Sequence, residues 1–220
     1  MTVLSEFEEM YLKRLFEVHN DQPDAIVKTS MLAELMGVSA ASTTEMIQRL
    51  ARRDLVTHIP YKGSRLTAEG FIVAARIKRR QLLLENLLSD IISFEGDIVA
   101  AACRMEHTID DELEAAIDRM LGYPERTARG ERIPVIKRRV QPFGANLLLP
   151  LANLPSGAQG RIEIIALEGT DSKTLQGLGL VVGATVTCLK GVIHVAGDRM
   201  DLSESILRRI LVRAEVGTDE

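Results

Sequence analysis

Residues 29–53 read TSMLAELMGVSAASTTEMIQRLARR, and this stretch decides the fold. Its first apolar run ends at Gly37, a residue type that ends helices because it tolerates the left-handed conformation. Ser39 follows closely and is a favoured N-cap residue, so a second helix is predicted to run to about Arg53. Two helices joined by so short a turn predict a helix-turn-helix.

The sequence on either side extends this motif. Ser5 and Glu8 have the spacing of a capping box, and the apolar residues after them recur at helical intervals, which predicts a helix over residues 5–19. Residues 55–57 and 65–67 predict two short strands with a turn at Gly63, the wing of a winged helix. Residues 1–72 are therefore expected to form a winged helix-turn-helix DNA-binding domain.

The remainder predicts a mainly α protein with a small β domain. Apolar periodicity and capping residues predict helices at 67–90, 97–107 and 110–121. Alternation of apolar and polar residues predicts strands at 161–167, 183–189 and 192–200. We expect a helical dimerisation and metal-binding domain over residues 73–140, a linker over 141–160 and a β domain over 161–216.

The composition limits the function classes. The chain has 220 residues, 46% hydrophobic and 26% charged, as in soluble globular proteins. The sequence has no apolar run of about 18 residues and no signal segment, so a cytoplasmic location is expected. The net charge of −4 argues against nucleic acid as a partner, but it hides a segregation: residues 49–80 carry nine basic side chains against two acidic ones. That local surplus of positive charge favours contact with DNA.

A cluster of possible metal ligands lies in the helix predicted at 97–107. Cys103, Glu106 and His107 are spaced i, i+3 and i+4, so they share one face of a helix. Sulfur, oxygen and nitrogen donors together suit a borderline divalent ion such as Fe²⁺, Mn²⁺, Co²⁺ or Zn²⁺ better than Ca²⁺. Met10, in the first helix, is the candidate for a further soft ligand. The competing interpretation is that Met10 and Cys103 only fill the core, as such residues usually do.

These motifs occur in an order that resembles the diphtheria toxin repressor family of iron- and manganese-dependent regulators. The similarity rests on the helix-turn-helix, on EMYL at residues 9–12 and on ACRMEH at 102–107, and it covers nearly the whole chain. It implies that the C-terminal strands form an SH3-like, FeoA-like β-barrel. It also implies a primary metal site of Met10, Cys103, Glu106 and His107. The co-repressor would be Fe(II) or Mn(II), with Zn(II), Co(II) or Ni(II) as substitutes in vitro.

The same resemblance implies an ancillary metal site from which this chain departs. Glu85 matches the family's glutamate, but Gln81 and Val99 stand where the family's iron regulators have histidines. Glu168 and Asp171 are the acidic residues available in the C-terminal domain. The possible ancillary set is therefore Gln81, Glu85, Glu168 and Asp171, and the site is weak, rebuilt from oxygen ligands, or absent.

For DNA, the resemblance implies that residues 39–53 are the recognition helix and that a homodimer reads a pseudopalindromic operator in double-stranded DNA. Small side chains at the start of this helix would approach the bases, and polar and basic ones would contact phosphates. The candidate DNA-binding residues are Ser39, Ala41, Ser42, Thr43, Thr44, Glu45, Gln48, Arg49, Arg52, Lys62 and Arg65.

The sequence thus predicts a metal-dependent transcriptional repressor of metal-homeostasis genes that is not an enzyme and has neither a membrane nor a small organic substrate as partner. One alternative is a winged-helix regulator that senses a non-metal ligand, in which case a chelator would leave DNA binding intact. Another is a zinc or iron hydrolase that uses the same ligands. It is disfavoured because no convincing general base or substrate-binding loop accompanies the cluster.

Overall fold

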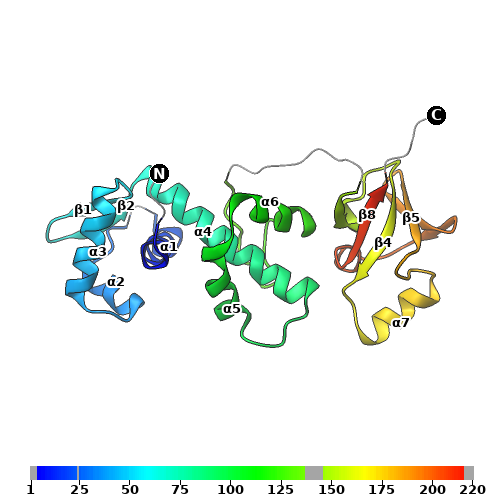
Figure 1. The fold of residues 1–220 in the computed structure, drawn as a ribbon, viewed down its shortest axis with the longest axis horizontal. Coiled ribbons are helices and arrows are strands. Elements are labelled where there is room, and N and C mark those ends of the chain that lie inside the picture. The colour runs from blue at the N-terminus through cyan, green and yellow to red at the C-terminus, as the bar shows by residue number, and fades with distance from the viewer. Residues whose placement is uncertain (1–3, 24, 137–145, 216–220) are drawn as a thin grey trace. The chain divides into compact units, whose positions relative to one another are not determined.

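The computed structural model describes residues 4–23, 25–136 and 146–215 (Figure 1). The chain divides into two compact units. The first combines Met1–Gln81, Cys103–Thr108 and Pro134–Lys137, and the second contains Leu82–Ala102, Ile109–Ile133 and Arg138–Glu220. All four residues predicted for the primary metal site belong to the first unit.

The first unit contains the predicted winged helix-turn-helix. Its elements in chain order are α1 (Glu6–Asp21), α2 (Thr29–Met36), α3 (Ala40–Arg52), β1 (Val56–Ile59), β2 (Gly63–Leu66) and the first part of α4 (Ala68–Asn86). The helix ends follow their capping residues. Ser5 and Glu8 form the expected capping box at α1. Gly37 ends α2 at φ 67°, and the Ser39 side chain accepts a hydrogen bond from the Ser42 N–H at the start of α3.

The wing is an antiparallel hairpin of β1 and β2, with Val56 opposite Leu66 and Ile59 opposite Gly63. Its second strand also pairs with the segment before α2, because Val27 and Ser64 exchange backbone hydrogen bonds of 2.8 and 2.9 Å. This close approach requires glycine at position 63, where φ is 136° and a Cβ atom would lie 2.2 Å from the Val27 carbonyl oxygen.

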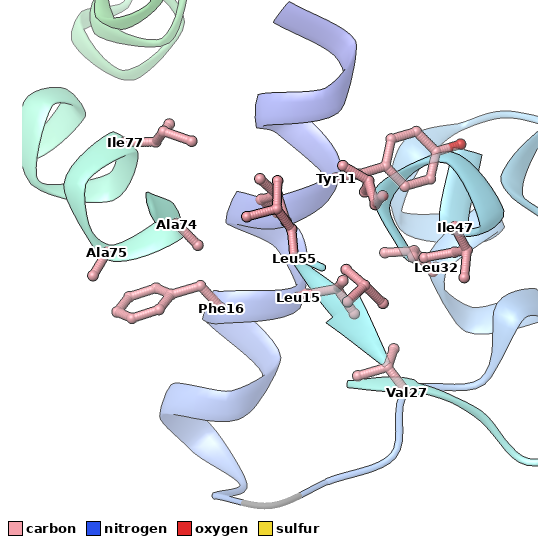
Figure 2. Packing of buried hydrophobic residues seen from close by; sticks show 13 residues of the cluster. Tyr11, Leu15, Phe16, Val27, Leu32, Ile47, Leu55, Ala74, Ala75 and Ile77 are labelled. Atoms are coloured by element: carbon pink, nitrogen blue, oxygen red, sulfur yellow. The ribbon is translucent and has the colours of Figure 1, made fainter. Parts of the chain in front are cut away.

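Helix α1 runs through the middle of the first unit's core (Figure 2). Phe16 points toward α4, where Ala74 lies, and its ring stacks at a tilt on Phe71 with centroids 4.9 Å apart. Tyr11 points to the other side, where Leu32 and Ile47 lie. Burying an apolar side chain of this size stabilises a fold by about 1.5–3 kcal/mol. The placement of α1 is therefore strongly determined on both of its faces.

The second unit holds the rest of the helices and the β domain. Its helical part consists of the end of α4, a π-helical turn η1 (Leu87–Ile91), the first part of α5 (Ile98–Met105) and α6 (Asp111–Met120). Asp110 caps α6, and Gly122 at φ 73° follows its end. In the described ranges, no helix is both long and apolar enough to span a bilayer.

The β domain is a six-stranded sheet in the order β3-β8-β4-β5-β6-β7. Its strands are β3 (Leu148–Pro150), β4 (Gln159–Ile165), β5 (Thr185–Leu189), β6 (Val192–Val195), β7 (Asp198–Met200) and β8 (Ile210–Glu215). Short helices η3 (Leu151–Asn153), α7 (Gly169–Gly177) and α8 (Glu204–Leu207) lie between them.

Three features of this sheet differ from the prediction. The strand expected at 192–200 is split into β6 and β7 by a turn, with Ala196 and Gly197 at positive φ. β3 and β8 were not predicted as strands, and β8 lies inside the sheet between β3 and β4. The expected barrel is not closed, because β3 and β7 are opposite edges of the strand order. An open, SH3-like sheet is the better description.

Candidate functional site

The first unit brings α1 against the segment 103–108. Met10 and Lys13 lie three residues apart on α1, and so on one face of that helix. On the other side, α5 ends at Met105, and Glu106–Thr108 forms a 3₁₀ turn, η2. The expectation that one α-helix carries residues 103 to 107 is therefore wrong. A 3₁₀ turn has about three residues per turn, which keeps Glu106 in line with Cys103.

The four residues predicted for the primary metal site converge. Cys103 Sγ lies 3.9 Å from Met10 Sδ and 3.9 Å from Glu106 Oε1. His107 Nε2 lies 3.3 Å from Glu106 Oε1. Two sulfur atoms, one carboxylate and one imidazole from two separate segments thus face a common space.

Two further charged residues join this cluster, and neither was predicted. Lys13 Nζ contacts Glu106 Oε1 and lies 3.4 Å from Cys103 Sγ. Glu9 Oε2 lies 2.5 Å from His107 Nδ1. The sequence held one signal for Lys13, namely a cation three residues after Met10 on the inward face of an amphipathic helix. Glu9 begins the EMYL segment on which the family resemblance rests, but nothing in its spacing indicated a contact with His107.

The burial of the cluster bears on whether its residues fit a cation. Glu106 and Lys13 are each 1% exposed. Burial raises the pKa of Glu106, and the charge of Lys13 opposes that rise. Glu106 Oε2 is buried and has no hydrogen-bond partner among the described residues. A carboxylate with one orphaned oxygen, whose other oxygen lies near sulfur and imidazole donors, suits a borderline divalent ion.

The contact between Glu9 and His107 supports the same fit. Metal-binding imidazoles commonly bond a carboxylate through the nitrogen that faces away from the metal, which fixes the ring orientation. Here Nδ1 faces Glu9, and Nε2 is left toward Glu106. Within the described ranges, no three His, Cys, Asp or Glu side chains form a ready metal-binding group. Lys13 is the side chain that stands among the donors.

The possible ancillary residues are found in two places. Gln81 and Glu85 are buried on α4, four residues apart, and both make interactions there. Glu168 and Asp171 are exposed at the start of α7. An ancillary metal site that combines these four residues stays a prediction.

The candidate DNA-binding residues lie mostly on the surface of the first unit. Those that are exposed on α3, at its N-cap or in the wing are Ser39, Ala41, Ser42, Glu45, Gln48, Arg49, Arg52, Lys62 and Arg65. Thr44 is half-buried, and its hydroxyl donates to the Ala40 carbonyl oxygen at 2.8 Å. Thr43 is wrong as a DNA contact, because it is fully buried and faces α1.

Two polar contacts join α1 to the recognition helix α3. The Tyr11 hydroxyl lies 3.2 Å from Thr43 Oγ1 in the buried interior. Arg53, the C-cap residue of α3, donates to the Glu8 carboxylate at 3.1 Å. Burial opposes ionisation of Glu8, but hydrogen bonds from Ser5 and Arg53 outweigh it and lower the pKa of Glu8. The helix that carries Met10 is therefore bonded directly to α3.

A winged helix-turn-helix beside a buried set of sulfur, carboxylate and imidazole groups defines the class of the protein: a metal-dependent DNA-binding regulator. Comparison with known families agrees. Residues 3–64 match the iron-dependent repressor N-terminal DNA-binding domain, residues 67–135 its metal-binding and dimerisation domain, and residues 149–214 the FeoA domain. The chain belongs to the diphtheria toxin repressor family of metal-dependent transcriptional repressors.

Individual relatives match over most of their length. The chain is 28% identical to the diphtheria toxin repressor of Corynebacterium efficiens, over 96% of this chain and 97% of that protein. It is 24% identical to the iron-dependent repressor IdeR of Mycobacterium tuberculosis, over 85% of each. A solved manganese-dependent transcriptional repressor in complex with manganese is 26% identical, with a TM-score of 0.54 over 94% of this chain and 99% of that one.

Proposed function

We propose that this repressor is activated by Fe(II) or Mn(II) held by Met10, Cys103, Glu106 and His107. The observation that carries the proposal is the convergence of these four side chains, in which Cys103 and His107 both approach Glu106 Oε1 while Glu106 Oε2 is buried without a hydrogen-bond partner among the described residues. Relatives described as iron-dependent and manganese-dependent support both ions. Zn(II), Co(II) and Ni(II) share the preference for nitrogen and sulfur donors and would substitute in vitro.

The chain's own contacts suggest how the site reaches DNA. Met10 of α1 and Cys103, Glu106 and His107 of the segment 103–108 would hold the ion, which would thereby join α1 to that segment. Tyr11 and Glu8, on either side of Met10, bond Thr43 and Arg53 of the recognition helix, so the position of α1 affects α3. A ligand shifts such an equilibrium only by its different affinity for the two arrangements. A coupling of about 1–3 kcal/mol per site corresponds to about a 5- to 150-fold change in DNA affinity.

On the DNA side, we propose that the exposed face of α3 and the wing contact a double-stranded operator. The domain descriptions support DNA binding and dimerisation, and two heads related by a twofold axis would read a pseudopalindrome. The proposed contacts are Ser39, Ala41, Ser42, Thr44, Glu45, Gln48, Arg49, Arg52, Lys62 and Arg65. Metal-homeostasis genes are the proposed targets, since the co-repressor would be the metal itself.

The remaining assignments follow from this role. We propose domain bounds of 1–72 and 73–140 for the first two domains. The β domain, predicted at 161–216 after a linker at 141–160, is proposed to extend back to β3, which pairs with β8. A repressor acts where chromosomal DNA lies, so we place it in the cytoplasm. We assign it no catalytic role, no membrane partner and no small organic substrate. Gln81, Glu85, Glu168 and Asp171 are proposed as a possible ancillary site.

The deciding experiment is a metal titration of operator binding by gel shift, under anaerobic conditions, with Fe²⁺ and Mn²⁺. Cys103→Ala should abolish the metal response, whereas Cys188→Ala should retain it, because Cys188 is buried in β5 of the FeoA domain. A metal response that survives Cys103→Ala would refute the site. DNA binding that persists in chelator would favour the alternative, a winged-helix regulator that senses a non-metal ligand.

A further inference from the structure

A buried lysine stands inside the donor set proposed for the metal. The Lys13 side chain is 2% exposed, and its Nζ contacts Glu106 Oε1 and lies 3.4 Å from Cys103 Sγ. A buried ammonium is unfavourable unless a carboxylate or another acceptor pairs with it. Glu106 is therefore engaged by Lys13 through one oxygen, while its second oxygen has no partner among the described residues.

An ammonium group and a divalent cation cannot both occupy the space between these donors. The lysine ammonium has three donors and no lone pair, so it cannot act as a ligand beside the other four groups. Both cations would use the same Glu106 carboxylate and the same Cys103 sulfur, and like charges a few ångströms apart repel strongly where water is excluded.

We propose that Lys13 is an internal competitor of the metal: its ammonium occupies the donor set in the metal-free protein and leaves Glu106 and Cys103 when a divalent ion binds. This inference rests on the proposed metal site and deepens it. The affinity of the site is then set by the four donors and by the work of displacing Lys13. The repressor consequently responds at a higher metal concentration than the donors alone would give.

Helix α1 offers Lys13 other partners after displacement. Glu9 and Glu17 lie four residues before and after it, the spacing at which side chains on one helix face meet, and Glu9 before Lys13 is the favourable order. Glu9 already lies at the edge of the site through its contact with His107 Nδ1. The flexible four-carbon stem of Lys13 allows its ammonium group to turn toward Glu9.

The test is calorimetric titration of the chelator-treated, full-length protein with Mn²⁺. Lys13→Met keeps the length of the stem and removes the charge, and we expect Mn²⁺ to bind at least about tenfold more tightly than to the wild type. Lys13→Gln keeps a hydrogen-bond donor for Glu106 and should tighten binding in the same direction. If Lys13→Met does not fold, the titration is done with Lys13→Gln instead.

A matched control is provided by Lys78, a second buried lysine of the same unit. Its Nζ bonds Glu17 Oε1 at 3.2 Å, and its charge acts on Glu106 more weakly than that of Lys13 does. Lys78→Met removes the same charge, and we expect it to change Mn²⁺ affinity by less than about threefold. Lys13→Arg keeps the charge and should give no gain. Equal gains from Lys13→Met and Lys78→Met would overturn the proposal, since the effect would then be one of general charge.

Two results separate failure of the competitor from failure of the metal site. If the wild type binds Mn²⁺ no more tightly than Cys103→Ala and Glu106→Gln variants do, the proposed site itself is wrong. If the wild type binds more tightly than those variants but Lys13→Met and Lys13→Gln leave the affinity unchanged or lower, the site stands and only the competitor is wrong.

Discussion

At the scale of single residues, Glu17 shows how charge stabilises the junction of α1 and α4. It accepts hydrogen bonds from Arg14 at 2.7 Å and from Lys78 at 3.2 Å. Burial opposes ionisation of Glu17, but these two cations outweigh it and lower its pKa. A carboxylate with a lowered pKa contributes stability that is present above its unfolded-state pKa and is lost as the pH falls through its folded-state pKa.

Glu17→Gln should therefore lower the free energy of unfolding near neutral pH and make its decline in acid shallower. Urea denaturation of the metal-free protein, from neutral pH down to about pH 3, measures both effects. Glu45→Gln, on the exposed face of α3, is the control and should change neither. A Glu17→Gln curve that runs parallel to the wild-type curve at every pH would contradict the assignment.

The site was predictable only in part at this scale. Cys103, Glu106 and His107 were proposed because their spacing is local, and Met10 because its thioether is a soft donor and its segment resembles a family motif. Lys13 acquires its role only when α1 meets the segment 103–108, and the sequence does not encode that meeting locally. Thr43 was placed wrongly because it was grouped with the other residues at the start of the recognition helix, whereas it lies on the inward side of α3 and faces Tyr11.

At the scale of elements, the predicted helices are the most accurate part of the sequence analysis. Helices α1, α3 and α6 each begin directly after a residue whose side chain caps the helix. Local sequence therefore defines where these helices start. The strands β3 and β8 depend on long-range pairing. Residues 210–212 of β8 are all buried, which removes the alternation by which an outer strand is recognised.

The contact between α1 and α3 gives a prediction at this scale. The Thr43 hydroxyl donates to the Ser39 carbonyl oxygen at 3.0 Å, so the Tyr11 hydroxyl must donate to Thr43 Oγ1. Tyr11→Phe removes that donor and leaves Thr43 bonded to Ser39, which should cost about 0.5–1.5 kcal/mol. Thr43→Val leaves a buried tyrosine hydroxyl without its acceptor and should cost more, about 1–3 kcal/mol.

Urea denaturation of both variants tests this order. Serine at position 43 is the control, because Thr43→Ser keeps the acceptor for Tyr11 and loses only a methyl group. If Tyr11→Phe destabilised the protein more than Thr43→Val, the direction assigned to the hydrogen bond would be wrong.

At the scale of the whole molecule, the chain is acidic although the function requires binding to a polyanion. The net charge is −4, but residues 49–80, which run from the end of the recognition helix through the wing into α4, carry nine basic side chains against two acidic ones. Lys62 and Arg65 of the wing are exposed. Acidic residues elsewhere in the chain set the average, so net charge alone gave the wrong indication about the partner, whereas its distribution gave the right one.

Lys62 leads to a prediction about the whole assembly. Each phosphate neutralised by a lysine releases counterions and steepens the dependence of log affinity on log salt by about 0.9. A dimer presents two wings, so Lys62→Ala should reduce the slope by about two rather than about one. Operator binding by fluorescence anisotropy across a range of salt concentrations, with Mn²⁺ present, measures this slope.

Lys173→Ala, on exposed α7 of the FeoA domain, is the control and should leave the slope unchanged. A slope that falls by only about one would mean that a single wing touches DNA, which would contradict a symmetric dimer on a pseudopalindromic operator.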